Sequence, residues 1–104
     1  MGYFNLVGRM EQKPEVKKSQ NGYTYSSFLV RMPVTYKTSS NEKEETMISL
    51  VAWGNVAEEI GKNFNKNDLV TLRGHLSSNS YKKDDGTIYY HNDLVVEKCS
   101  LLQV

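Results

Sequence analysis

The stretch Thr46–Gly54, Thr-Met-Ile-Ser-Leu-Val-Ala-Trp-Gly, decides the fold of this chain of 104 residues. It contains no charged residue and no proline, is rich in β-branched and apolar side chains, and ends in an aromatic residue beside a glycine. This composition is typical of a strand that is buried on at least one face. Side chains alternate along a strand, so the expected core side holds Ile48, Leu50 and Ala52. Trp53 then lies on the opposite face with Met47, where it would contact a partner or a ligand.

The residues directly after this strand change to helical spacing. Apolar side chains lie four apart at Val56, Ile60 and Phe64. Asn55 is suited to an N-cap, and Glu58 follows three residues later, as in a capping box. We therefore expect a short amphipathic helix over 55–64, which would cover one end or one edge of the sheet.

Strand patterns lie on both sides of this strand–helix unit. They cover Tyr3–Met10, Tyr23–Val34, Leu69–Tyr81 and Thr87–Leu102. Hairpin turns are expected at Asn21-Gly22 and Asp85-Gly86, and the polar stretches 12–20 and 36–45 are expected to be loops. Five strands with one helix between the third and fourth follow the order of the OB-fold, a small Greek-key barrel. The sequence thus predicts one all-β domain over residues 1–104, with a single short helix.

The composition indicates a water-soluble globular protein. Charged residues make up 24% of the chain and hydrophobic residues 38%. No apolar run approaches the ~20 residues that span a membrane, and no signal peptide is recognisable at the N-terminus. The single cysteine, Cys99, has no partner for an internal disulfide, which fits a reducing compartment. It lies among apolar residues and is expected to be a small packed side chain.

Motifs for catalysis or metal binding are missing from the sequence. The carboxylates Glu42, Glu44 and Glu45 lie together in a polar loop, where a dry paired site is not expected. His75 and His91 are isolated from each other and from Cys99, so no zinc-type spacing occurs. No glycine-rich phosphate loop and no serine-elbow motif is present. We therefore expect no enzyme activity, no cofactor and no metal.

Aromatic residues interleaved with cations are the remaining signal. Tyr36-Lys37 follows the second strand, Trp53 ends the third, and Tyr81-Lys82-Lys83 leads into the last hairpin. Residues 1–41 also hold six Lys or Arg against two Glu, although the net charge of the chain is only +1. Bases stack on aromatic rings at ~1–3 kcal/mol per base, and phosphates attract nearby cations. This pattern indicates a surface for single-stranded nucleic acid.

The other tyrosines on the expected strands have a simpler interpretation. We favour cross-strand pairs or subunit contacts over base stacking for Tyr23, Tyr25, Tyr89 and Tyr90. Arg9, Arg31 and Arg73 alternate with the apolar positions of their strands, so they are expected to point outward.

Several short motifs together resemble the bacterial single-stranded DNA-binding proteins. They are Val7-Gly8-Arg9, Pro14-Glu15-Val16, Asn21-Gly22, Val51-Ala52-Trp53-Gly54-Asn55-Val56-Ala57-Glu58, Leu69-Val70, Arg73-Gly74-His75-Leu76, Ser80-Tyr81 and Asp85-Gly86. They occur in that family's order and spacing from about Asn5 to Leu102. Each motif alone is weak, whereas the set is specific.

The resemblance implies an OB-fold, single-stranded DNA as the ligand, and a homo-oligomer that is usually a tetramer. It places the family's stacking aromatics on Tyr36, Trp53 and Tyr81. A fourth aromatic position falls on Met47, which departs from the family because a flexible thioether replaces a flat ring. Arg73 and His75 also depart from the residue types usual at their positions. The full set of expected DNA contacts is Tyr36, Trp53, Tyr81, Met47, Arg9, Arg31, Lys37, Arg73, His75, Lys82 and Lys83.

Family members normally continue into a flexible linker and an acidic tip that recruits replication and repair proteins. The sequence given ends at Leu101-Leu102-Gln103-Val104 without them, which fits either a truncated chain or a compact variant from a phage or other mobile element. The expected function is to coat single strands during DNA replication, recombination and repair, in the cytoplasm and associated with the nucleoid. The alternative is an accessory OB module of the primosomal type that binds replication proteins. RNA binding by the same surface is a third possibility, because stacking discriminates poorly between sugars.

Overall fold

The structure is a computed structural model, and it describes residues 2–33 and 45–102. Its elements in chain order are β1 (Tyr3–Met10), β2 (Lys17–Lys18), β3 (Thr24–Pro33), β4 (Glu45–Trp53), α1 (Gly54–Asn63), β5 (Leu69–Lys82) and β6 (Ile88–Leu101). The five long strands lie where the sequence predicts them, with ends shifted by at most one residue. The short strand β2 is an addition, because it lies in a stretch that reads as a polar loop. It pairs with β3 through Lys17 and Lys18, opposite Tyr25 and Thr24.

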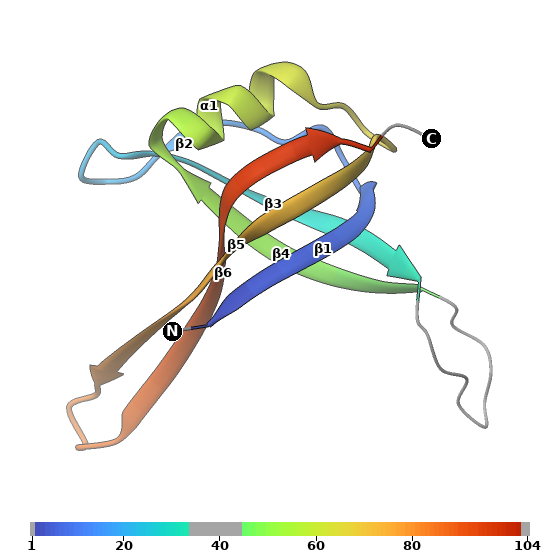
Figure 1. Cartoon of the computed structure of the whole chain (residues 1–104). Coiled ribbons are helices and arrows are strands. Elements are labelled where there is room, and N and C mark those ends of the chain that lie inside the picture. The colour runs from blue at the N-terminus through green and yellow to red at the C-terminus, as the bar shows by residue number, and fades with distance from the viewer. Residues whose placement is uncertain (1, 34–44, 103–104) are drawn as a thin grey trace, which may run out of the picture.

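The strands form one sheet in the order β1-β5-β6-β4-β3-β2, and a further pairing of β1 with β3 closes it. All pairings are antiparallel except the one between β4 and β6, which is parallel at Val51 and Val95. Figure 1 shows the resulting barrel, with α1 lying across one end and the outer half of β5 and β6 projecting as an arm. A closed sheet of five long strands with a helix between the third and fourth has the topology of the OB-fold.

The inner face of β4 matches the predicted alternation. Leu50 and Ala52 are buried and Ile48 packs against the same core, whereas Met47 and Trp53 are 45% and 46% exposed. The barrel core contains Met10, Phe28, Val30, Leu50, Ala52, Val70, Leu72, Val96 and Cys99. Ala57 and Ile60 of α1 and Phe64 just after it complete the core, so the helix seals the barrel with its apolar face.

Gly8 allows β1 to contact two strands at once. The strand pairs with β5 from Tyr3 to Arg9, and it pairs with β3 at Arg9 and Met10. A Cβ atom on Gly8 would lie 2.5 Å from the carbonyl oxygen of Arg31 and still closer to the side chain of Val30. The absence of a side chain therefore lets β3 cross closely enough to close the barrel.

The start of α1 differs from the prediction. The helix begins at Gly54, its N-cap is Trp53, and no side chain caps its first N–H groups. Asn55 lies inside the helix, so the predicted capping box with Glu58 was wrong. The physical reason is Gly54, whose φ of +60° turns the chain straight from β4 into α1. The residue pattern alone does not indicate that a glycine makes this turn without a capping side chain.

Candidate nucleic-acid interface

The outward face of β3 and β4 carries one aromatic pair. Tyr25 lies opposite Trp53 in the strand register, with ring centroids 5.5 Å apart and planes tilted by 38°. Lys17 of β2 lies opposite Tyr25 on its other side, so a cation stands beside the pair. Toward the far end of the same two strands, Met47 lies opposite Arg31. This face can therefore offer an exposed aromatic ring at one end and a thioether at the other.

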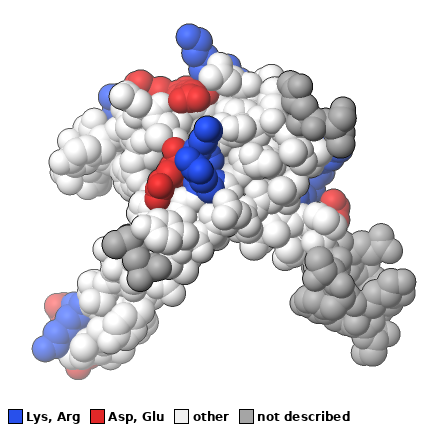
Figure 2. Space-filling view, viewed as in Figure 1, with Lys and Arg blue, Asp and Glu red and all other residues white. Residues whose placement is uncertain are grey.

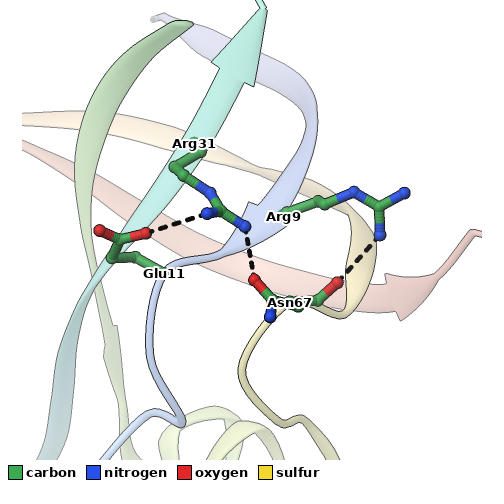
Figure 3. Close-up of polar contacts among 4 residues, drawn as sticks. All are labelled: Arg9, Glu11, Arg31 and Asn67. Atoms are coloured by element: carbon green, nitrogen blue, oxygen red, sulfur yellow. Dashed lines mark hydrogen bonds and ion pairs between the residues drawn. The ribbon is translucent and has the colours of Figure 1, made fainter.

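A polar cluster joins the ends of β1 and β3 to the turn before β5, as Figure 3 shows. Arg31 Nη2 donates to Asn67 Oδ1 at 2.6 Å, and Arg31 Nη1 lies 3.4 Å from Glu11 Oε1. Arg9 Nη1 donates to the Asn67 carbonyl oxygen at 3.0 Å. Asn67 itself has a φ of 72°, a left-handed conformation that Asn tolerates better than most residues.

The two arginines of this cluster differ in how much of their guanidinium group remains for binding an anion. Arg31 is partly buried, and its Nε atom is buried with no hydrogen-bond partner among the described residues. Its guanidinium is therefore engaged mostly within the fold. Arg9 is exposed and uses one nitrogen on Asn67, which leaves donors that can reach an anion.

The arm carries a second aromatic pair. Tyr81 of β5 lies opposite Tyr89 of β6, with ring centroids 5.4 Å apart and planes only 15° from parallel. Lys83 Nζ lies 4.4 Å from the centroid of the Tyr89 ring, within the range of a cation–π contact. In Figure 2, lysine side chains lie beside acidic side chains at the far end of this arm, away from the barrel.

Arg73 and His75 lie on the outer side of β5, on a different part of the barrel from the Tyr25–Trp53 pair. Arg73 lies opposite Asn5 of β1 and Lys98 of β6. His75 Nδ1 lies 2.7 Å from Glu97 Oε2. Figure 2 shows basic and acidic side chains side by side near the middle of the barrel, so this view shows no continuous basic groove.

The predicted contacts thus fall into groups along the barrel and the arm. Trp53 and Met47 share a face, and Arg9 and Arg31 share a cluster that adjoins this face, because Arg31 pairs with Met47. Tyr81 shares the arm with the lysines that follow it. Tyr36 and Lys37 lie outside the described residues. The interpretation of Tyr25 and Tyr89 as members of cross-strand pairs is confirmed. The sequence did not reveal that their partners are two of the predicted stacking residues, because that depends on the strand register.

Cys99 is 8% exposed, and burial is the main reason that the pKa of its thiol is raised to about 12. The charges of Glu59 and Asp68 raise it further. The expectation of a small packed side chain at Cys99 is therefore confirmed. Within residues 2–33 and 45–102, no three His, Cys, Asp or Glu side chains are grouped to hold a metal ion. In the same part of the chain, no helix is long and apolar enough to cross a membrane.

Comparison with known proteins gives one consistent result. The single-stranded DNA-binding protein of Lactiplantibacillus plantarum is 30% identical over 98 residues, which cover 94% of this chain and 49% of that protein. Single-stranded DNA-binding protein 1 of Staphylococcus aureus is 26% identical, with 94% and 63% covered. Single-stranded DNA-binding protein 2 of Streptococcus agalactiae is 29% identical, with 94% and 74% covered.

The chain therefore spans about half to three quarters of the length of these relatives. The model of the single-strand binding protein family matches residues 1–102, which is nearly the whole sequence. With the closed barrel, this match shows that the chain belongs to the single-strand binding protein family.

Proposed function

We propose that this chain binds single-stranded DNA with little sequence preference. The observation that carries the proposal is that Trp53 and Tyr81 expose 46% and 56% of their surface on the outside of the sheet, each beside a second aromatic ring. Large aromatic side chains held at the surface can stack on bases of any kind, because every base has a π-face. The relatives named above are single-stranded DNA-binding proteins, which supports the same ligand.

Cations would hold the phosphates. Lys82 and Lys83 follow Tyr81 on the arm, and Arg9, in the cluster with Asn67, has guanidinium donors that can reach an anion. Arg31 and His75 contribute less, because each already contacts a carboxylate within the fold. The proposed contacts remain the full set predicted from the sequence, Tyr36, Trp53, Tyr81, Met47, Arg9, Arg31, Lys37, Arg73, His75, Lys82 and Lys83.

The cellular role that fits such binding is protection of exposed strands in DNA replication, recombination and repair, without catalysis. The protein would act in the cytoplasm, associated with the nucleoid. We propose a homotetramer, with a dimer as the alternative, because one barrel contacts few nucleotides. Exposed apolar side chains on the outer face of the barrel support self-association, among them Val7 at 48% and Leu29 at 44% exposure. Light scattering that gives a monomer at micromolar concentration would contradict this assembly.

The test of DNA binding is a titration of labelled oligo-dT against the same oligonucleotide in a duplex, with oligo-U as a third ligand. We expect tight binding to oligo-dT and much weaker binding to the duplex. Equal affinity for single strand and duplex would overturn the proposal. Tighter binding to oligo-U than to oligo-dT would assign the surface to RNA instead.

A second candidate is an accessory module that binds replication proteins. The same exposed apolar residues favour it, because they could form a protein contact surface. Fluorescence of Trp53, the single tryptophan, separates the two functions. A change on adding oligo-dT supports stacking, whereas no change supports the accessory module.

A further inference from the structure

Tyr89 is the most covered of the three tyrosines on the arm. It is 39% exposed, compared with 56% for Tyr81 and 74% for Tyr90. The Tyr81 ring lies nearly parallel to it, and the Lys83 ammonium lies over the ring. With two neighbours against its ring, Tyr89 has less free face for a base than Tyr81 has.

The turn at the end of the arm fixes the backbone that carries Lys83. Its N–H donates to the Thr87 carbonyl at 2.8 Å, and its own carbonyl accepts from Gly86 N–H at 2.9 Å. Asp85 Oδ1 accepts a further bond from Thr87 N–H at 2.8 Å, and hydrogen bonds from Thr87 lower the pKa of this carboxyl group. The backbone of Lys83 is therefore fixed by the turn, and its long side chain is directed by its contact with the Tyr89 ring.

Tyr89 thus contacts two groups with complementary uses. A planar ring suits a base, and an ammonium suits a phosphate. Both lie against the same side chain, the Tyr81 ring centroid 5.4 Å and the Lys83 Nζ 4.4 Å from the centroid of the Tyr89 ring. A lysine side chain loses rotamer freedom when it is fixed by a ligand, and holding it in advance reduces that cost.

We propose that Tyr89 is a positioning residue of the single-strand site, which holds the Tyr81 ring and the Lys83 ammonium so that they take one nucleotide as a unit. The base stacks on Tyr81 and its phosphate contacts Lys83. This inference rests on the proposed binding of single-stranded DNA and adds to it a residue that the motif pattern does not assign.

The experiment measures the affinity of the full chain for oligo-dT over a range of salt concentrations, for the parent and for Tyr89→Ala, Tyr89→Leu and Tyr89→Phe. We expect Tyr89→Ala to weaken binding by about twofold to twelvefold, since aromatic and cation–π contacts contribute ~0.5–1.5 kcal/mol. The slope of log affinity against log salt should flatten by up to ~0.7, the value of one phosphate contact to a single strand. Tyr89→Phe should retain both properties, because the ring rather than the hydroxyl makes the contacts.

Tyr89→Leu separates the ring from mere bulk. It keeps an apolar side chain on the strand, so it guards against a variant that fails to fold, and it should still flatten the salt slope. Tyr90→Ala is the matched control, because Tyr90 is the next residue along β6 and points to the opposite face of the arm. Its affinity and salt slope should equal those of the parent.

The outcomes distinguish this inference from the proposed function. If the parent fails to bind oligo-dT, both are overturned. If the parent binds and Tyr89→Ala keeps its affinity and its salt slope, the positioning role is wrong while DNA binding stands. A loss in Tyr89→Phe as large as in Tyr89→Ala, or an equal loss in Tyr90→Ala, would also refute the role of the ring.

Discussion

Replacing Trp53 can separate DNA affinity from stability, because this residue belongs to two structural elements. It is the last residue of β4, paired with Tyr25, and it is also the N-cap of α1. Trp53→Ala removes a stacking surface, which should weaken binding to oligo-dT by ~1–3 kcal/mol, or about 5-fold to 150-fold. It also removes the aromatic pair, which should lower the free energy of unfolding by ~0.5–1.5 kcal/mol.

Trp53→Ser should restore stability without restoring affinity. The N-cap has extended backbone angles, φ −123° and ψ 151°, and makes no side-chain hydrogen bond. A serine there can accept from an N–H of the first helical turn, which stabilises a helix by about 1 kcal/mol. We therefore expect Trp53→Ser to unfold close to the parent's denaturant midpoint while binding oligo-dT as weakly as Trp53→Ala.

The assay is fluorescence anisotropy of a labelled oligo-dT, since the variants lack tryptophan, together with urea unfolding followed by circular dichroism. The salt dependence of binding should stay the same, because no phosphate contact is lost. Trp53→Phe serves as the control that keeps a ring. If Trp53→Ser regains affinity along with stability, Trp53 acts through the fold and the stacking argument is wrong.

Four further outcomes follow from the described contacts. Arg73→Ala should flatten the slope of log affinity for oligo-dT against log salt by ~0.7 and change the free energy of unfolding by less than ~0.5 kcal/mol. An unaltered slope would show that Arg73 does not contact a DNA phosphate. Arg31→Ala should lower the free energy of unfolding by ~1–3 kcal/mol, measured in urea, because its bonds to Asn67 and Glu11 are lost. Gly8→Ala should cost at least ~1–3 kcal/mol through overpacking against β3, seen as a lower Tm. The thiol of Cys99 should react slowly with iodoacetamide at pH 8 until the protein is unfolded, because only the thiolate is nucleophilic and the pKa of the folded thiol is raised to about 12. The same raised pKa means that the contribution of Cys99 to stability is complete below the ordinary thiol pKa and is lost as the pH rises toward 12.

Hydrophobic alternation was enough to predict the barrel. The faces of β4 follow from the period of two, because inward and outward side chains are chemically different along that strand. The helix was also predicted, from the spacing of Val56, Ile60 and Phe64 and from the apparent capping box. Its first residue was not, because Asn55 and Glu58 match a capping box in composition while Gly54 makes the turn by its backbone.

The pairing of Tyr81 required information that the sequence pattern lacks. A two-residue turn centred on Asp85-Gly86 would set Tyr81 opposite Tyr90. The observed turn instead runs from Lys83 to Thr87, and it sets Tyr81 opposite Tyr89. One residue of register exchanges the two faces of a strand, so the neighbour of a predicted site residue depends on a detail of turn geometry. β2 escaped prediction for a related reason, since two lysines on an edge strand carry no hydrophobic pattern.

The way the barrel closes has a consequence for how the chain folds. The hairpins β3–β4 and β5–β6 join strands that are neighbours in sequence, whereas β1 pairs with β5 across most of the chain length. Bringing such distant segments together carries a large entropic cost before any contact is gained, so folding is expected in milliseconds to seconds rather than microseconds. During synthesis the first strand emerges long before its main partner. Phe4 and Leu6, which pack on the core in the folded barrel, are then exposed to water until β5 has been synthesised. During this interval the chain is expected to be most prone to aggregate with other copies.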